Sequence, residues 1–415
     1  MSPTIPAETL LALGKHFGTP LYVYHADTIE KQFNTIKEAF RDSNTRFFYA
    51  CKALTNLSIL KVIRETGCGI DCSSINEVHL ALRAGFLPEN ILYTSSSIAF
   101  EEIITAKEIG VNINIDSYSN LEKFARCYGN TYGVGIRLRP GIMAGGNLKI
   151  STGHNKSKFG IPLNQLDAVQ SLISTYGLKV RGLHIHTGSD VKDAEVFLKG
   201  VGVLFELASS FPDLQYLDLG GGFKVAYHDQ DTEIDMTALG QKLGKAFAAF
   251  QQQHQRELQF WFEPGKYLVS KAGYFLTSVN VLKPTDTIHF AGVNSGFNHL
   301  IRPMFYDAYH HIENISNPGA SKQIYTVVGN ICETDTFGTD REIAELREGD
   351  MLLFYNAGAY GMEMASNYNS RFRPAEVMVK GEAVYLIRQR EELDDLIRKQ
   401  VFEKVDLRKT LLETS

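Results

Sequence analysis

Short apolar runs alternate with amphipathic segments along the first two thirds of the chain. Runs rich in β-branched and aromatic residues lie near 47–52, 67–73, 90–95, 111–116, 133–139, 180–187, 214–220 and 258–263. The segments between them have helical periodicity, at 57–66, 75–85, 99–109, 118–128, 164–176, 194–210 and 236–254, and 27–40 predicts a helix before the first strand. Eight strand–helix units predict an α/β fold, a TIM-like (β/α)8 barrel. An open doubly wound sheet fits less well because its glycine fingerprint is absent after the first strand.

From about residue 274 the pattern changes to strands with no helices between them. The predicted strands are 274–282, 287–291, 323–328, 351–355 and 377–387, and the early run 21–24 can join them. The charged segment 391–409 predicts a terminal helix. We therefore expect a barrel over 27–273, and an all-β domain, a β-sandwich or barrel, formed by 1–26 together with 274–415.

Composition narrows the classes of partner. The 415 residues carry a net charge of -5 and no long basic run, which argues against nucleic-acid binding. No apolar stretch approaches the roughly 20 residues that span a bilayer, and the start lacks a secretory signal, so a cytoplasmic protein with a small-molecule partner is expected. The five cysteines include no CxxC pair, which argues against a disulfide framework and a zinc site and leaves room for a catalytic cysteine.

Barrel enzymes build their sites at the carboxyl ends of the strands, and this chain places polar residues there. They are Lys52, Asp71, His184, His186, Ser189, the run Gly220-Gly221-Gly222 and the run Glu263-Pro264-Gly265-Lys266. An ammonium at the end of a buried strand must be paired, deprotonated or converted to an imine, so Lys52 is either a candidate Schiff-base nucleophile or a lysine that reaches out to solvent.

The other residues at these ends also allow two interpretations. The glycine run can bind an anion through its backbone N–H groups or form a flexible turn, although phosphate sites of barrels commonly follow strands 7 and 8. Glu263 is either a structural ion-pair partner or the partner of a cationic ring nitrogen. His186 is either a core histidine or a ring stacked on a flat cofactor. The set favours a phosphorylated ligand.

In sum, the ordered motifs resemble the fold-type III pyridoxal-phosphate-dependent decarboxylases, specifically the diaminopimelate decarboxylase family, over essentially the whole chain. The motifs are Tyr49-Ala50-Cys51-Lys52-Ala53, Ser151-Thr152-Gly153 with Ser157-Lys158-Phe159-Gly160, His186-Thr187-Gly188-Ser189, Gly220-Gly221-Gly222-Phe223, Glu263-Pro264-Gly265-Lys266, Leu300-Ile301-Arg302-Pro303, Tyr306-Asp307-Ala308-Tyr309, Ile331-Cys332-Glu333, Ala357-Gly358-Ala359-Tyr360-Gly361 and Ser366-Asn367-Tyr368-Asn369-Ser370-Arg371.

The resemblance implies roles for these residues. Lys52 would bind the aldehyde of pyridoxal phosphate, His186 would stack on its ring, and Glu263 would keep its nitrogen protonated. The phosphate contacts would come from Ser189, Gly220, Gly221, Gly222, Gly265, Lys266 and Tyr360, with Asp71 nearby. The family's shared active site implies a homodimer in which Cys332, the candidate acid, and Glu333 arrive from the partner chain.

The resemblance also implies the substrate, meso-2,6-diaminopimelate, which would be converted to L-lysine and carbon dioxide in the last step of lysine biosynthesis. Its distal end carries both an ammonium and a carboxylate. Arg302 suits the carboxylate, with Lys266, Tyr306 and Tyr360 beside it, and Glu333 suits the ammonium.

Several departures and rivals remain open. Lys266 stands where the family has arginine, Asp190 where it has an amide, and 293–296 replaces the family's Asp-Ala-Gly. Arg137 and Arg139 on the fifth strand can be internal ion-pair partners. The rival functions are a decarboxylase of a related basic amino acid or carboxynorspermidine, a non-catalytic pyridoxal-phosphate-binding homologue, and an amino-acid racemase, which would place a cation rather than Glu263 at the ring nitrogen.

Overall fold

The computed structural model describes residues 3–141 and 157–404, so the predicted motif at 151–153 lies outside the described residues. Eight parallel strands close a barrel, which confirms the predicted fold class. In chain order they are β2 (Thr45–Ala50), β3 (Gly69–Cys72), β4 (Ile91–Thr94), β5 (Asn112–Ile115), β6 (Val134–Arg139), β8 (Val180–His184), β9 (Tyr216–Asp218) and β10 (Gln259–Phe262). The ring runs β5-β4-β3-β2-β10-β9-β8-β6, the pairing of β5 with β6 closes it, and β7 (Ile161–Pro162) adds to β6.

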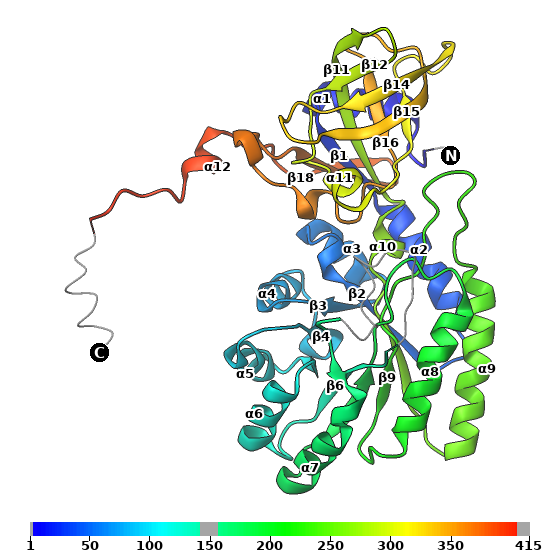
Figure 1. Ribbon diagram of the computed structural model, residues 1–415, viewed down its shortest axis with the longest axis vertical. Helices are drawn as coiled ribbons and strands as arrows, with labels where there is room; N and C mark the ends of the chain where they lie inside the picture. The colour runs from blue at the N-terminus through cyan, green and yellow to red at the C-terminus, as the bar shows by residue number, and fades with distance from the viewer. Residues whose placement is uncertain (1–2, 142–156, 405–415) are drawn as a thin grey trace.

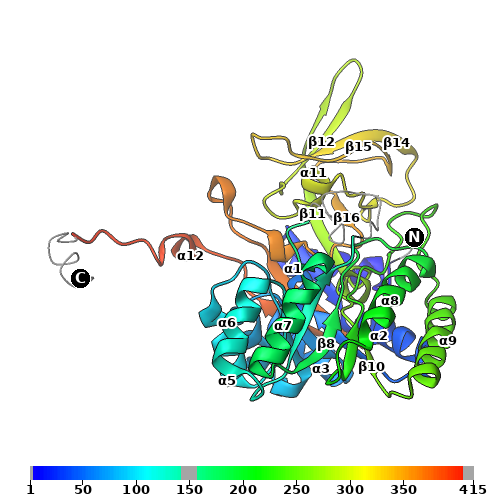
Figure 2. The same ribbon diagram turned by 60° about the horizontal axis from the view of Figure 1, so that its bottom comes forward.

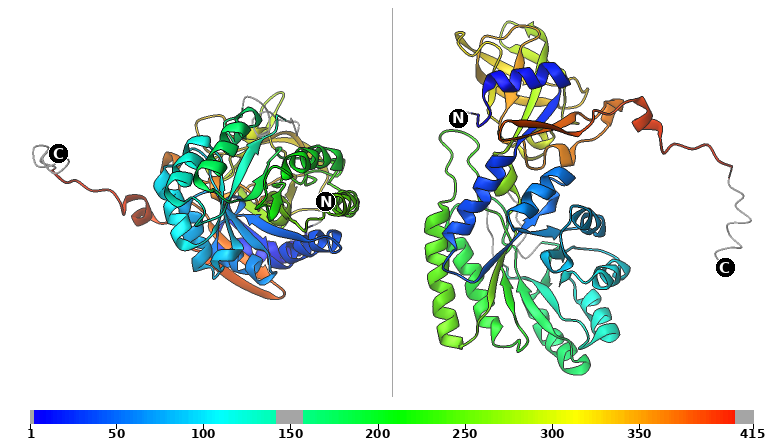
Figure 3. Two further views of the ribbon diagram at one scale, coloured as in Figure 1. Left: turned by 90° about the horizontal axis from the view of Figure 1, so that it is seen from below. Right: turned by 180° about the vertical axis from the view of Figure 1, so that it is seen from behind.

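Helices surround this barrel, as the view along it shows (Figure 3). They are α2 (Ala26–Ala39), α3 (Leu57–Glu65), α4 (Ile75–Arg83), α5 (Phe100–Ile109), α6 (Tyr118–Tyr128), α7 (Leu166–Tyr176), α8 (Ala194–Ala208), α9 (Met236–His254) and the short α10 (Lys266–Val269). Side chains cap several of them: Asn56, Ser74 and Ser117 accept hydrogen bonds from the first turns of α3, α4 and α6. Across 3–141 and 157–404, no helix is long and apolar enough to cross a membrane.

A second, mixed sheet lies at one end of the barrel (Figure 1). Its strands are β1 (Leu21–His25), β11 (Gly273–Pro284), β12 (His289–Val293), β13 (Ile312–Asn314), β14 (Lys322–Val328), β15 (Thr336–Ala344), β16 (Met351–Phe354), β17 (Ala375–Lys380) and β18 (Ala383–Arg388). The order is β15-β14-β12-β11-β1-β17-β18, with β16 pairing with β11 and β13. β1 lies between β11 and β17, so the predicted joining of the early strand is confirmed. The exact division at residues 26/27 and 273/274 stays a prediction.

Several details of this second region differ from the prediction. The predicted strand 377–387 is a hairpin, because Gly381 takes a left-handed conformation (φ +57°) that turns the chain between β17 and β18. Of the predicted terminal helix 391–409, the structure describes 391–404, and within that part only α12 (Leu393–Ile397) is helical. The helices α1 (Ala7–Phe17) and α11 (Arg302–Tyr306), and the strands β13 and β15, were not predicted. Short 3-10 turns cover 51–53, 88–90, 163–165, 362–364 and 368–370.

A buried polar network joins the barrel to the second sheet. Asn56 donates to Glu376 Oε2 of β17 at 3.0 Å, and Tyr24 of β1 donates to Glu376 Oε1 at 2.7 Å. Arg388 of β18 also binds this carboxylate. Strands β12, β14 and β15 extend away from the barrel, and the segment with α12 leads away from the body of the molecule (Figure 2). The network fixes the second sheet above the carboxyl ends of the barrel strands.

Candidate active site

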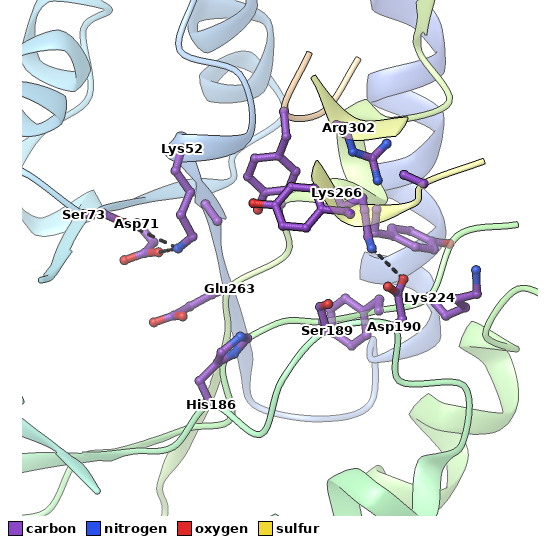
Figure 4. Close-up of a pocket in the computed structure, with 18 of the residues that line it drawn as sticks. Lys52, Asp71, Ser73, His186, Ser189, Asp190, Lys224, Glu263, Lys266 and Arg302 are labelled. Atoms are coloured by element: carbon purple, nitrogen blue, oxygen red, sulfur yellow. Dashed lines mark hydrogen bonds and ion pairs between the residues drawn. The ribbon is translucent and has the colours of Figure 1, made fainter. Parts of the chain in front are cut away.

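A cavity of about 800 Å³ opens where the barrel meets the second sheet. Eleven of the predicted site residues line it: Lys52, Asp71, His186, Ser189, Gly222, Glu263, Gly265, Lys266, Arg302, Tyr306 and Tyr360. Lys52 lies at one side of the cavity and the Lys266–Asp190 pair at the other (Figure 4). The fold therefore brings together residues that lie more than 300 positions apart in the sequence.

Lys52 lies in the 3-10 turn that follows β2, so its side chain starts at the rim of the barrel. Its Nζ is 3.3 Å from Asp71 Oδ2, at the end of β3, and 3.5 Å from Ser73 Oγ. Burial lowers the pKa of Lys52, but Asp71, Tyr360 and Glu263 raise it more, so the net pKa lies above the ordinary value. Lys52 is thus a paired ammonium facing the cavity.

Glu263 lies beneath Lys52 in a cluster of buried acids. Its carboxylate, Asp218 at the end of β9 and His184 at the end of β8 bring one ligand atom each within 4.8 Å of one another. Burial raises the pKa of Glu263 well above its usual range, and Asp218 and Asp71 raise it further. Burial likewise raises the pKa of Asp218 to about 7. Glu263 Oε1 is buried and lies 3.5 Å from His184 Nε2, but has no hydrogen-bond partner among the described residues. This oxygen can accept a hydrogen bond from a ligand.

His186 lies two residues beyond β8, between the glycine run and the cavity. Its Nδ1 accepts a hydrogen bond from the Gly221 N–H at 3.3 Å. Burial lowers the pKa of His186 to about 3, and Arg137 and Lys52 lower it too, so the ring is neutral at physiological pH. A neutral ring held by the backbone presents a flat face to the cavity rather than a charge.

The glycine run has a packing role that the sequence did not indicate. A Cβ on Gly221 would lie 2.1 Å from the Glu263 carbonyl oxygen, and one on Gly222 would lie 2.1 Å from the Gly188 carbonyl oxygen. Gly220 and Gly222 also have φ values of +67° and +97°. The loops after β8, β9 and β10 therefore approach as closely as they do only because these positions lack side chains. Ser189 Oγ, buried in the same place, has no hydrogen-bond partner among the described residues.

The opposite side of the cavity is rich in charge. Arg302, at the start of α11, lies over the Tyr227 ring at 5.0 Å and contacts His310 Nε2 at 3.3 Å, but makes no ion pair within 3–141 and 157–404. Lys266, in contrast, binds Asp190 at 2.5 Å. Burial raises the pKa of Tyr227, but Arg302 and Lys266 lower it more, which is the effect expected of two nearby cations.

Tyr306 and Tyr360 line the same cavity from the second region of the chain, and the N–H of Tyr360 donates to the Ala53 carbonyl, next to Lys52.

Cys332 and Glu333 do not line this cavity. They lie exposed in the loop between β14 and β15, where Glu333 accepts a hydrogen bond from Tyr368 at 2.9 Å. The buried Asp335 fixes this loop by accepting hydrogen bonds from the N–H groups of Phe297 and Ile331. Within one chain, therefore, the predicted acid and the predicted ammonium partner stay outside the site.

Sequence reasoning missed some residues of the site and left others open. Asp218 ends a buried strand as Glu263 does, so the same signal could have indicated it. Asp190 was noted only as a departure, and its pairing with Lys266 could not be inferred from the sequence. The role of Arg137 and Arg139 was left open. Arg137 lines the cavity over the Phe159 ring, Arg139 donates to the Ser157 carbonyl, and neither makes an ion pair with a described residue.

Comparisons with known proteins agree with this geometry. Residues 26–270 match the family of the pyridoxal-dependent decarboxylases, pyridoxal binding domain. The chain is 37% identical to the diaminopimelate decarboxylase of Methanothermobacter thermautotrophicus over 94% of this chain and 93% of the relative, and 35% identical to that of Campylobacter jejuni over 93% and 96%. The crystal structure of the Helicobacter pylori diaminopimelate decarboxylase with L-lysine superposes with a TM-score of 0.86 at 32% identity, covering 94% of this chain and 98% of that one. The chain belongs to the diaminopimelate decarboxylase family of pyridoxal-phosphate-dependent enzymes.

Proposed function

We propose that this protein removes carbon dioxide from meso-2,6-diaminopimelate to give L-lysine, with pyridoxal phosphate as its cofactor. The observation that carries the proposal is the arrangement of one cavity. Lys52 and Glu263 lie at one side, and the guanidinium of Arg302, which makes no ion pair with a described residue, lines the same space. A substrate whose reacting end is an amino acid and whose distal end carries a carboxylate fits both sides. L-lysine, the product, is the ligand named for the Helicobacter pylori relative.

The residues around the cavity fit the cofactor. Glu263 Oε1 and Ser189 Oγ are buried oxygens without a hydrogen-bond partner among the described residues, and they suit the ring nitrogen and the phosphate of pyridoxal phosphate. Lys52 is the amine that would hold its aldehyde, and the close-packed glycine loops beside Ser189 would form the phosphate pocket. When bound, pyridoxal phosphate supplies a sink for the electron pair that carbon dioxide leaves behind.

The chain's own residues then have distinct tasks. Glu263 would hold a proton on the ring nitrogen, because the positive charge of that nitrogen would favour the carboxylate form of a group whose pKa burial has raised. The neutral His186 ring would support the flat face of the cofactor without adding charge. Lys52 would give up the cofactor to the substrate amine and would take it back when the product amine leaves. Arg302 binds the distal carboxylate through its planar fork, with Tyr306 and Lys266 beside it.

The acid that returns a proton to Cα is proposed to be the Cys332 thiol of a second copy. Cys332 and Glu333 are exposed on a fixed loop outside their own cavity, which supports a homodimer in which each chain completes the other's site. A free thiol acid needs a reducing compartment, so we also propose that the protein works in the cytoplasm, a location that cell fractionation would test.

The direct test is carbon dioxide release by the purified protein with pyridoxal phosphate. Turnover of meso-diaminopimelate is expected to exceed that of ornithine, arginine, lysine and carboxynorspermidine, because only the first offers Arg302 a carboxylate on an amino-acid end. Equal or faster turnover of one of the others would assign that substrate instead. A protein that binds the cofactor but releases no carbon dioxide from any of them would be a non-catalytic homologue.

A further inference from the structure

Asp190, the ion-pair partner of Lys266, lines the cavity yet has no task in the reaction described so far. Asp190 Oδ1 lies 2.5 Å from Lys266 Nζ, and the two residues come from the loops after β8 and β10. Figure 4 shows the two side chains pointing toward each other across the cavity wall, on the side away from Lys52. Both residues line the cavity, with side chains 28% and 11% exposed, so a ligand can reach them.

One carboxylate oxygen of Asp190 is not used by any described residue. Its second oxygen, Oδ2, accepts no hydrogen bond from a described residue, whereas Oδ1 is engaged by Lys266. Its backbone is left-handed, with φ +59°, a conformation that aspartate tolerates better than most residues. The turn after Ser189 therefore fixes where the carboxylate lies, and one of its oxygens remains available.

Nearby charges distinguish this acid from others in the cavity. Asp231 already forms an ion pair with Lys224. Its Oδ2 lies 2.6 Å from Lys224 Nζ, and both side chains are 11% exposed. Arg302 and Lys266 both lie over the Tyr227 ring, at 5.0 and 5.9 Å, so two cations and the Asp190 carboxylate share one part of the wall. This set presents positive and negative charge side by side, which matches an amino-acid end that carries a carboxylate and an ammonium.

We propose that Asp190 is a specificity-determining residue whose carboxylate binds the ammonium at the end of the substrate that does not react. Arg302 and Lys266 take the neighbouring carboxylate, so that the distal amino-acid group lies against the existing ion pair with each charge opposed. The inference rests on the proposed function and deepens it. It gives the distal ammonium an acidic partner within the same chain, in addition to Glu333 of a second copy.

Asp190→Asn tests the charge alone, because asparagine has the same shape and also tolerates a left-handed backbone. The measurement is equilibrium binding to the holoenzyme of L-lysine and of 6-aminohexanoate, which keeps the carboxylate and the reacting amine but lacks the ammonium beside the carboxylate. We expect the wild-type protein to prefer L-lysine and the variant to lose roughly ten- to a hundred-fold of that preference, the range of a charge-assisted hydrogen bond. The affinity for 6-aminohexanoate should not fall.

Glu233→Gln is the matched control, since Glu233 forms a comparable ion pair with Lys271 but neither residue lines the cavity. It should leave the preference for L-lysine intact. If Asp190→Asn prefers L-lysine over 6-aminohexanoate as strongly as the wild-type protein does, the inference is overturned. It is also overturned if the wild-type protein itself shows no such preference, and that measurement does not require a variant to fold. Weaker binding of pyridoxal phosphate by Asp190→Asn, with the preference retained, would also overturn it and assign Asp190 to the phosphate loop.

The same experiment separates this inference from the proposed reaction. Binding of L-lysine and 6-aminohexanoate needs no turnover, so a lost preference in Asp190→Asn would stand even if meso-diaminopimelate released no carbon dioxide. Conversely, rapid carbon dioxide release with an unchanged preference would keep the proposed function and remove Asp190 from the recognition of the distal end.

Discussion

The barrel and the second region contribute to the cavity in opposite ways. The barrel brings Lys52, Asp71 and Glu263 together within one chain. Burial raises the pKa of the two acids, and their charges raise the pKa of Lys52 against the effect of burial. The second region supplies Arg302 and Tyr360 to the same cavity but holds Cys332 exposed outside it.

This contrast separates two parts of the chemistry. The residues that fit the cofactor are complete in one chain, whereas the residue proposed as the acid is not in its own site. Buried strand ends position the first group, and an exposed surface loop carries the second. If this division is right, loss of Cys332 can be complemented by a second chain, whereas loss of a barrel residue such as Lys52 removes the site of its own chain.

Lys52→Ala should have the largest effect on activity. Removing the amine that holds the cofactor is expected to lower turnover by on the order of 10⁴-fold or more, and to abolish borohydride-reducible attachment of the cofactor to the chain. Carbon dioxide release and mass spectrometry of the reduced protein measure the two effects. Lys271→Ala, outside the cavity, is the control and should retain both. Full turnover by Lys52→Ala would show that Lys52 is not the amine that binds the cofactor.

Cys332→Ala should lower turnover by roughly 10²–10⁴-fold, the range for loss of a proton donor, while leaving cofactor attachment intact. Cys127→Ala, another exposed cysteine, is the control and should be neutral.

Mixing Cys332→Ala with Lys52→Ala extends that prediction to the assembly. If sites are shared, re-formed dimers contain one intact site, and activity should recover to as much as roughly a quarter of wild type. Failure to recover, although mixed dimers form, would place Cys332 in the site of its own chain.

The sequence predicted the barrel well because its signals are local. Each strand is a short apolar run, and Lys52, Asp71 and Glu263 stand at or just beyond the strand ends, where a charge among buried residues is conspicuous. Asp218 carries the same signal on the three-residue strand β9 but was overlooked beside the glycine run that follows it.

The second region was predicted less well because its signals depend on distant partners. Strand β15 has exposed, charged residues at its middle and pairs with β14 through two register irregularities, so its alternation is broken. The turn at Gly381 lies inside a run that is apolar on both sides. The pairing of Asp190 with Lys266 joins positions 76 residues apart, which no local pattern indicates.

Glu263→Gln should lower turnover by roughly 10²–10³-fold, as expected when a preorganised charge is removed from a buried site. Glutamine keeps the shape but cannot oppose a positive charge on the cofactor ring. Lys52 stays in place, so the cofactor should remain attached, and this separates the variant from Lys52→Ala. The ratio of turnover to cofactor attachment measures the difference. Equal turnover in Glu263→Gln and wild type would leave Glu263 as a structural acid.

Asp218→Asn should have the smallest effect, visible in stability rather than in attachment. The pKa of Asp218 is about 7 in the folded protein and near 3.9 when unfolded, so between these values the native state binds more protons. The free energy of unfolding therefore falls as the pH rises from about 4 to about 7, and this contribution is absent in asparagine. The charges of Asp71, Glu263 and Arg137 also influence the titration of Asp218. Because Asp218 and Glu263 interact, the two carboxyl groups share the pH dependence.

Urea unfolding of the cofactor-free protein at pH 5 and pH 8 measures this difference. Relative to wild type, Asp218→Asn should gain on the order of 1–2 kcal/mol on going from pH 5 to pH 8. Asp213→Asn, an exposed acid before β9, should show no such change. If Asp218→Asn instead loses stability relative to wild type at pH 8, Asp218 is a stabilising carboxylate. The buried acids on the barrel side of the cavity would then be balanced by the nearby cations rather than by a proton held on the acids.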